Sequence, residues 1–476
     1  MHLSFPLFRK RPVLAMVLAV LCFHFPSSAR QISVDFDEGT DLVAAVWHLA
    51  GAREYNMCAV APYAESLDAW CAPLKGHKAV ALAQQYYRDG IGYDAVVAFG
   101  KTLRLKDDGV ETDADMLQML DDRWSPEMWE EFLPALDDFY RRSDFHKWYL
   151  STDSIRQATV EAFDAVTEQI DIPWFGKFFN DDGATFSITL SLLDGGCNYG
   201  LSAKTKDGRH VLTPVIGCAR YEDGYIGFNT PAVLPIVIHE FCHAYCNPLI
   251  DSHYSEMEQK AVKVFQHHEG MLKRQAYTNP VIMMYETLVR SSVITYLRQH
   301  RHLQSVEVKA LVAEEEQLGF ALTATLVEGM ENLQTSASGA QGLKALMPDF
   351  VKRVNAFNVK AYEKRKKAEK RKADRHRVHY RSNIRDGARN VPAGEMCLTI
   401  IFDRPMREAI SLGLTDKEFP AYKGHAWSDD KRTLTVNFVT KPSTAYGLSI
   451  LGDGFIAQDG TPSVASEIRF TTAAER

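Results

Sequence analysis

The pentapeptide HEFCH at residues 239–243 constrains this chain most, because an apolar run leads directly into it. The run, residues 233–238, reads Val-Leu-Pro-Ile-Val-Ile and predicts a buried helix that begins near Pro231 or Pro235. On a helix the two histidines, four residues apart, share one face. Burying two imidazoles and a carboxylate without a partner is costly, and a metal ion supplies that partner. The chain must therefore fold so that this helix face meets a further ligand.

The spacing H-E-x-x-H predicts a zinc site. His239 and His243 would bind one Zn²⁺, and Glu240 would serve as general base toward a water that the ion activates. In a chain with 16 histidines a chance match of this kind has a probability of roughly a few per cent, so the apolar context supports the assignment. The metzincin pattern is excluded, because Cys246 and Leu249 stand where it requires Gly and His.

The third metal ligand is expected on a later helix, as in the gluzincin peptidases. The downstream candidates are Glu256, Glu258, Glu269 and Glu286. Periodicity favours Glu286, which falls within the apolar face of the predicted helix 281–297. Arg290, one turn later, would form an i,i+4 ion pair and could orient a ligating carboxylate. Glu256 and Glu258 remain open as alternatives.

Two segments resemble a known family. HEFCH with the following Cys246-Asn247-Pro248-Leu249, and the downstream Glu286-Thr287-Leu288-Val289-Arg290, are similar to a gluzincin-like family of exported bacterial proteins of unknown function. The resemblance covers about residues 155–365. It implies that His239, His243 and Glu286 hold one zinc ion and that Glu240 is catalytic. The implied activity is that of a zinc metallopeptidase acting on a peptide or protein substrate.

Two other functions remain open from the sequence. The chain could be a non-catalytic, zincin-like binding or surface protein, or a zinc amidase acting on a non-peptide amide of the cell envelope. An intact Glu240 argues against the first, because a binding protein has no need of a general base. The donor to the oxyanion is not chosen by the sequence; the candidates are His253, Tyr254, Tyr277 and Tyr285. A net charge of −7 argues against a nucleic-acid partner.

The N-terminus predicts export. Residues 1–29 combine basic residues, the apolar stretch 12–23 and small residues before a cleavage point, as in a secretory signal peptide. No later run has the length of a transmembrane segment. We therefore expect a periplasmic or secreted protein, with lipoprotein anchoring through Cys22 disfavoured by the bulky Leu21 before it. Two disulfides, joining Cys58 to Cys71 and Cys197 to Cys218, are candidates in an exported chain.

The region before the zinc helix predicts helices followed by a small sheet. Residues 30–154 have helix-period apolar residues at 42–50, 80–87 and 129–140, the last preceded by a cap at Ser125. The alternating segments 186–193 and 211–216 predict strands of a mostly antiparallel sheet. Residues 225–228 could form its edge, although a core strand is the default interpretation. Zincins bind extended peptides at such an edge. Together with residues 155–365 this predicts an α+β fold.

The C-terminal region predicts an all-β domain. A basic linker at 366–390 precedes residues 391–476, where short strands alternate apolar and polar residues. The expected core residues are Leu398, Ile400, Phe402, Leu434, Val436, Phe438, Leu448, Ile450, Ile468 and Phe470. Segments 401–406, 427–435 and 444–448 resemble a bacterial Ig-like domain, which implies a β-sandwich without chemistry of its own.

Overall fold

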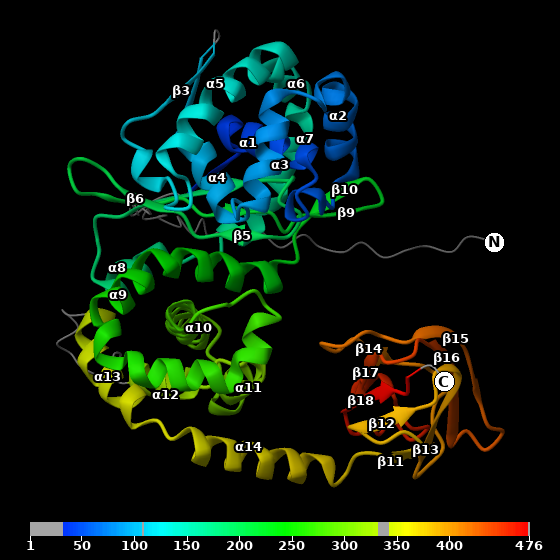
Figure 1. The fold of residues 1–476 in the computed structure, drawn as a ribbon. Helices are drawn as coiled ribbons and strands as arrows, with labels where there is room; N and C mark the ends of the chain where they lie inside the picture. Colours follow the sequence, from blue (N-terminus) through cyan, green and yellow to red (C-terminus); the bar gives the residue numbers. More distant parts are fainter. Residues whose placement is uncertain (1–31, 107–108, 332–341, 475–476) are drawn as a thin grey trace, which may run out of the picture. The chain divides into compact units, whose positions relative to one another are not determined.

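The chain divides into two units, Met1–Phe357 and Asn358–Arg476 (Figure 1). The computed structural model describes residues 32–106, 109–331 and 342–474, so the predicted signal peptide and Cys22 lie outside the described residues. Helices and several small sheets occur together, and the predicted α+β class is confirmed. Among the described helices, none combines the length and apolar character needed to cross a bilayer.

The first unit opens with a bundle of short helices. They are α1 (Glu38–Ala50), α2 (Ala61–Cys71), α3 (Lys78–Arg88), α4 (Asp94–Lys101), α5 (Pro126–Ser143), α6 (Phe145–Ser151), α7 (Asp153–Thr167) and α8 (Ile172–Phe179), with the short helix η3 (Leu117–Met119) and the hairpin β2 (Leu103–Lys106) and β3 (Gly109–Thr112) among them. The three predicted helices are confirmed as α1, α3 and α5, and the Ser125 side chain caps α5 by accepting from the Met128 amide. Trp47 packs edge-on against both Trp124 and Phe132 in the core of this bundle.

A small mixed sheet follows the bundle. Its strands are β1 (Ser33–Asp35), β4 (Thr185–Leu190), β5 (Asn198–Tyr199), β6 (Ser202–Lys204), β7 (His210–Leu212) and β8 (Val215–Ile216). β4 pairs in parallel with β1, β7 and β8, whereas β5 and β6 pair antiparallel with β8 and β7. The prediction of a mostly antiparallel sheet is therefore wrong around β4, because alternation identifies a strand but not the direction of its neighbour.

The outer strand of this sheet is formed by β5 and β6. The register of β5 on β8 continues into that of β6 on β7, so residues 197–205 and 209–217 form one long hairpin. Residues 225–228 form neither the edge nor a core strand of this sheet, because β10 (Tyr225–Gly227) pairs with β9 (Arg220–Glu222) in a separate two-stranded hairpin. The candidate disulfides are not formed either, since all seven described cysteines are free.

Helices complete the first unit. They are α9 (Thr230–Lys273), α10 (Pro280–His300), α11 (Ser305–Leu318), α12 (Thr323–Met330) and α13 (Met347–Ala356), the last preceded by the short helix η5 (Leu343–Leu346). α9 has 44 residues and begins with Pro231 in its first turn, as predicted. Pro235 lies inside α9 and has no N–H to donate, so the carbonyl oxygen of Pro231 lacks its helical donor. The Arg301 guanidinium donates to that oxygen instead. α10 packs along α9.

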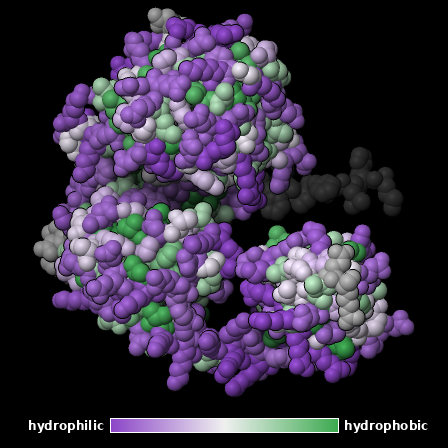
Figure 2. Space-filling model, viewed as in Figure 1, coloured by the Kyte–Doolittle hydropathy of each residue, from purple (hydrophilic) through white to green (hydrophobic). Residues whose placement is uncertain are grey.

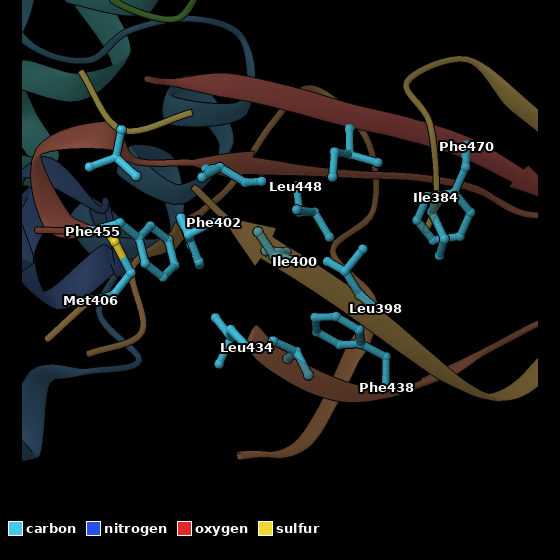
Figure 3. Close-up of a cluster of buried hydrophobic side chains, with 14 of the residues drawn as sticks. Ile384, Leu398, Ile400, Phe402, Met406, Leu434, Phe438, Leu448, Phe455 and Phe470 are labelled. Atoms are coloured by element: carbon cyan, nitrogen blue, oxygen red, sulfur yellow. The ribbon is translucent and has the colours of Figure 1, made fainter. Parts of the chain in front are cut away.

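The second unit contains a helix and two four-stranded sheets. They are α14 (Val359–Asp374), the sheet of β11 (Tyr380–Ser382), β13 (Gly394–Phe402), β16 (Thr433–Thr440) and β15 (Ala421–Trp427), and the sheet of β12 (Ala388–Val391), β18 (Ser466–Thr472), β17 (Ala445–Ile450) and β14 (Leu412–Gly413). The two sheets share one hydrophobic core, and all ten core residues expected from the sequence are buried in it (Figure 3). In the view of Figure 2, hydrophilic residues cover most of the surface of each unit.

Candidate metal centre

Three side chains from two helices converge in the first unit. His239 and His243 on α9 place their Nε2 atoms 3.1 Å apart. Glu286 on α10 lies opposite them, with Oε2 at 3.4 Å from His239 Nε2 and Oε1 at 3.4 Å from His243 Nε2. The three residues predicted as metal ligands are thus brought together, and within the described residues they form the one group of His, Cys, Asp or Glu able to hold a metal ion.

The spacing of these atoms fits a tetrahedral ion. Zinc bonds of about 2.0–2.1 Å at tetrahedral angles hold neighbouring ligand atoms about 3.3–3.4 Å apart. The Nε2–Nε2 separation of 3.1 Å and the two N–O separations of 3.4 Å, which end on different oxygens of Glu286, are close to this spacing. Two imidazoles and a carboxylate are also the donor set of zinc sites that keep a fourth position open. The residues therefore fit zinc in geometry and in chemistry.

The tautomer of His243 is set within α9. Its Nδ1 lies 3.1 Å from the side-chain oxygen of Asn247, one helical turn further on. An amide oxygen can only accept a hydrogen bond, so Nδ1 carries the proton and donates. Nε2, which faces His239 and Glu286, is then the ring atom that can bind a metal ion in place of a proton.

Arg290 forms a hydrogen bond with the carboxylate of Glu286. Its Nε donates to Oε2 at 3.1 Å, and its terminal nitrogens reach Glu315 at 2.7 Å and the Tyr277 hydroxyl at 3.1 Å. The guanidinium also lies 4.3 Å from the ring centre of Phe320, within cation–π distance. Four groups from α10, α11 and the neighbouring loops thereby fix the orientation of Glu286.

Glu240 occupies a tight, buried place beside the three ligands. Its side chain is buried, and burial raises its pKa above the usual value, while the nearby His239 and His243 lower it in part. Gly200, between β5 and β6, packs against this turn of α9. A Cβ at Gly200 would lie 2.6 Å from the Glu240 carbonyl oxygen and 3.0 Å from the His243 Cβ. The outer strand of the sheet is thus in direct contact with the HExxH turn.

The electrostatics of the cluster favour bound positive charge. Burial lowers the pKa of His243, but its contacts with Glu286 outweigh burial and raise that pKa to about 9. Burial likewise raises the pKa of Glu286, but the two histidines hold it well below its usual range. A buried carboxylate beside two imidazoles attracts either a proton or a metal ion, and the two compete for the same lone pair.

The other sequence candidates lie elsewhere. Glu256 and Glu258 are exposed on α9 itself, and Glu256 follows His243 by about 20 Å of helix. Glu269 forms an ion pair with Lys273. Among the candidate oxyanion donors, Tyr277 contacts the cluster through Arg290, whereas the Tyr285 hydroxyl bonds Asp251 and the His253 ring bonds the Leu249 carbonyl oxygen. None of these four donors is placed beside the two histidines by a described hydrogen bond.

Sequence reasoning missed several residues that build the site. Gly200, Glu315 and Phe320 reach it from other elements, and no local pattern marks such tertiary contacts. Asn247 carried a usable signal, because it stands one helical turn after His243, where an amide can accept from the ring.

Taken together, the fold and the site define an α+β protein with a partly buried His-His-Glu cluster suited to a metal ion. The chain belongs to the family described as "Domain of unknown function (DUF4932)", whose model matches residues 100–353. That region begins within α4 and ends within α13, so it contains His239, Glu240, His243 and Glu286. No curated protein matches the chain.

Weak similarities to solved structures add little. The N-terminal part of the bacterial S-layer protein SbsC matches at 14% identity over 48% of this chain and 57% of that chain, with a TM-score of 0.16. A longer crystal structure of SbsC matches at 14% identity over 47% of this chain and 33% of that chain, again with a TM-score of 0.16. The chain spans a third to little more than half of these structures, and a TM-score this low does not indicate a shared fold.

Proposed function

We propose that this protein is a zinc-dependent metallopeptidase of the gluzincin type. The observation that supports it most is the convergence of the His239 and His243 Nε2 atoms, 3.1 Å apart, with one carboxylate oxygen of Glu286 at 3.4 Å from each of them, Oε2 from His239 and Oε1 from His243. A bound Zn²⁺ would supply Lewis acidity, lowering the pKa of a water and polarising a scissile carbonyl. Arg290 and Asn247 would fix the orientation of the two ligands they contact.

Glu240 is the general base in this proposal. It follows His239 directly on α9 and is buried beside the two histidines. Its raised pKa brings it nearer to the working pH, which favours taking a proton from water and returning it to the leaving amine. A protein that only bound a metal would gain nothing from a buried carboxylate at this position.

Two parts of the proposal concern the rest of the chain. The resemblance of residues 391–476 to a bacterial Ig-like domain, with two sheets around one core, supports a non-catalytic spacer or anchoring module. The basic and apolar pattern of residues 1–29 supports export, to the periplasm or the medium. A zinc amidase acting on a non-peptide envelope amide remains the second candidate function, because the same site geometry serves any amide carbonyl.

The proposal is tested with the full chain and two substitutions. We expect about one zinc per chain in wild type and in Glu240→Gln, and loss of zinc in Glu286→Ala, measured by elemental analysis. Turnover of a mixed peptide library, followed by mass spectrometry, should fall by about 10²-fold or more in Glu240→Gln. Glu258→Gln, an exposed glutamate on the same helix, is the matched control.

The outcomes separate the alternatives. Equal turnover by wild type and Glu240→Gln would end the proposed mechanism, and undiminished zinc in Glu286→Ala would remove Glu286 as a ligand. Including peptides joined through side-chain amides in the library distinguishes the envelope amidase, which would cleave these in preference to linear peptides.

A further inference from the structure

The outer strand beside the HExxH turn has a free edge of limited length. In the long hairpin, residues Leu201, Ala203 and Thr205 direct their backbone groups inward to the partner strand. The alternation of an antiparallel ladder turns the N–H and C=O groups of Gly200, Ser202 and Lys204 outward. Those of Gly200 and Ser202 make no hydrogen bond to any residue the structure describes. An extended peptide can pair with such groups by strand addition.

Lys204 is the exception, because Gln118 already occupies its outward edge. The Lys204 amide donates to the Gln118 side-chain oxygen at 3.0 Å, and the Gln118 amide nitrogen donates to the Lys204 carbonyl. One side-chain amide thereby makes both hydrogen bonds that a neighbouring strand would make. Lys206 and Asp115 form an ion pair beside it, which ties the η3 segment to the end of this hairpin a second time.

A cavity of about 530 Å³ lies between this edge and α9. Ser202, Ala203 and Lys204 line it from the strand, Tyr245 is among the residues that line it from α9, and Gln118 lines it from η3. The α9 residues of the cavity begin with Ala244, one position after His243, and follow the face of the helix that points away from the two histidines. Phe179 stacks on the Tyr245 ring at 4.2 Å and gives the cavity an aromatic wall.

We propose that Gln118 sets the length of peptide that the edge strand can bind. The inference rests on the proposed function, with the peptide paired to Gly200 and Ser202. Four residues of strand separate Gly200, at the HExxH turn, from Lys204, which is about 13 Å. A peptide lying along this edge meets the Gln118 amide after about three or four residues on one side of the bond to be cleaved. The protein therefore prefers substrates that end shortly beyond that bond.

The test uses a peptide that wild type cleaves, lengthened one residue at a time on either side of the cleaved bond. In wild type kcat/KM should fall about tenfold once the peptide passes Lys204 in one of the two series. In free energy, a tenfold fall is equivalent to the loss of one pair of backbone hydrogen bonds. In Gln118→Ala that fall should shrink to about twofold or less. Gln84→Ala, an exposed glutamine on α3, is the matched control and should behave as wild type.

A second measurement does not depend on turnover. Amide hydrogen exchange at Lys204 should be about tenfold faster in Gln118→Ala than in wild type, because its acceptor is removed. Equal length dependence in wild type and Gln118→Ala, or unchanged exchange at Lys204, would overturn the inference. Absence of any cleavage that depends on Glu240 would instead overturn the proposed function, so the two failures are distinguishable.

Discussion

Asp194 is a fully buried acid in the loop between β4 and β5, six residues before Gly200. Burial, followed by repulsion from Asp41, raises its pKa to about 8. An aspartate in an unfolded chain has a pKa of about 3.9, so the folded protein holds a proton that the unfolded chain releases between about pH 4 and pH 8. The stability that Asp194 contributes is complete below pH 4 and is lost as the pH rises toward 8.

We therefore expect Asp194→Asn to flatten the pH dependence of stability. Wild type should lose free energy of unfolding from pH 5 to pH 8, by at most about 1.4 kcal/mol per pH unit for this one group, and the variant should lose less. Thermal unfolding at four pH values between 5 and 8 measures the difference. Asp122→Asn, at an exposed position, should follow wild type; identical slopes in wild type and Asp194→Asn would contradict the expectation.

The residues of the site differ in how far the sequence could predict them. His239 and His243 carry their own spacing, and Glu286 stands out as a carboxylate on an apolar helix face, so three positions could be placed without coordinates. Glu315 and Gly200 could not, because each reaches the cluster only through packing between distant elements. Such contacts leave no periodic trace in a single sequence.

At the scale of elements, the contact between the outer strand and α9 is intolerant of added volume. Gly200→Ala would place a Cβ against the Glu240 carbonyl oxygen and the His243 Cβ. The first atom belongs to the helix backbone, and the second is bonded directly to it. We expect a loss of about 1–3 kcal/mol in stability and a shift of the two side chains that costs turnover. Gly227→Ala in β10, where a Cβ meets nothing within 4 Å, is the control, and both are measured by thermal unfolding and peptide turnover.

The elements themselves were predictable where one pattern ran long enough. Helices α1, α3 and α5 and the strands of the second unit follow their apolar periods. The order and direction of the strands in the first sheet could not be predicted from apolar periods. Strands β5 to β8 are only two or three residues long each, and their pairing depends on the hairpin as a whole. The apolar period of a strand indicates which of its faces is buried, but the strands that it pairs with depend on the rest of the fold.

At the scale of the whole molecule, the two units have separate cores. Residues 358–476 contain a complete core shared by two sheets, so we expect this fragment to fold alone. Its midpoint of thermal unfolding should match one of two transitions in the full chain, measured by calorimetry. A fragment that stays unfolded, or a full chain with one transition only, would show that the units depend on each other.

The placement of the ligands on two helices links metal binding to assembly. Helix formation in α9 alone brings His239 and His243 onto one face, whereas Glu286 arrives only when α10 docks. In the proposed enzyme the ion would therefore cross-link the two helices. The docked state would bind the ion tightly, and any state in which α10 has moved away would bind it weakly. At a free metal concentration of 100 Kd, binding of the ion would add about 2.7 kcal/mol to the stability of the docked state. Removal of the metal by a chelator would then weaken the packing of α10 on α9 and abolish activity. The supply of metal would therefore govern the lifetime of the folded protein as well as its rate of turnover.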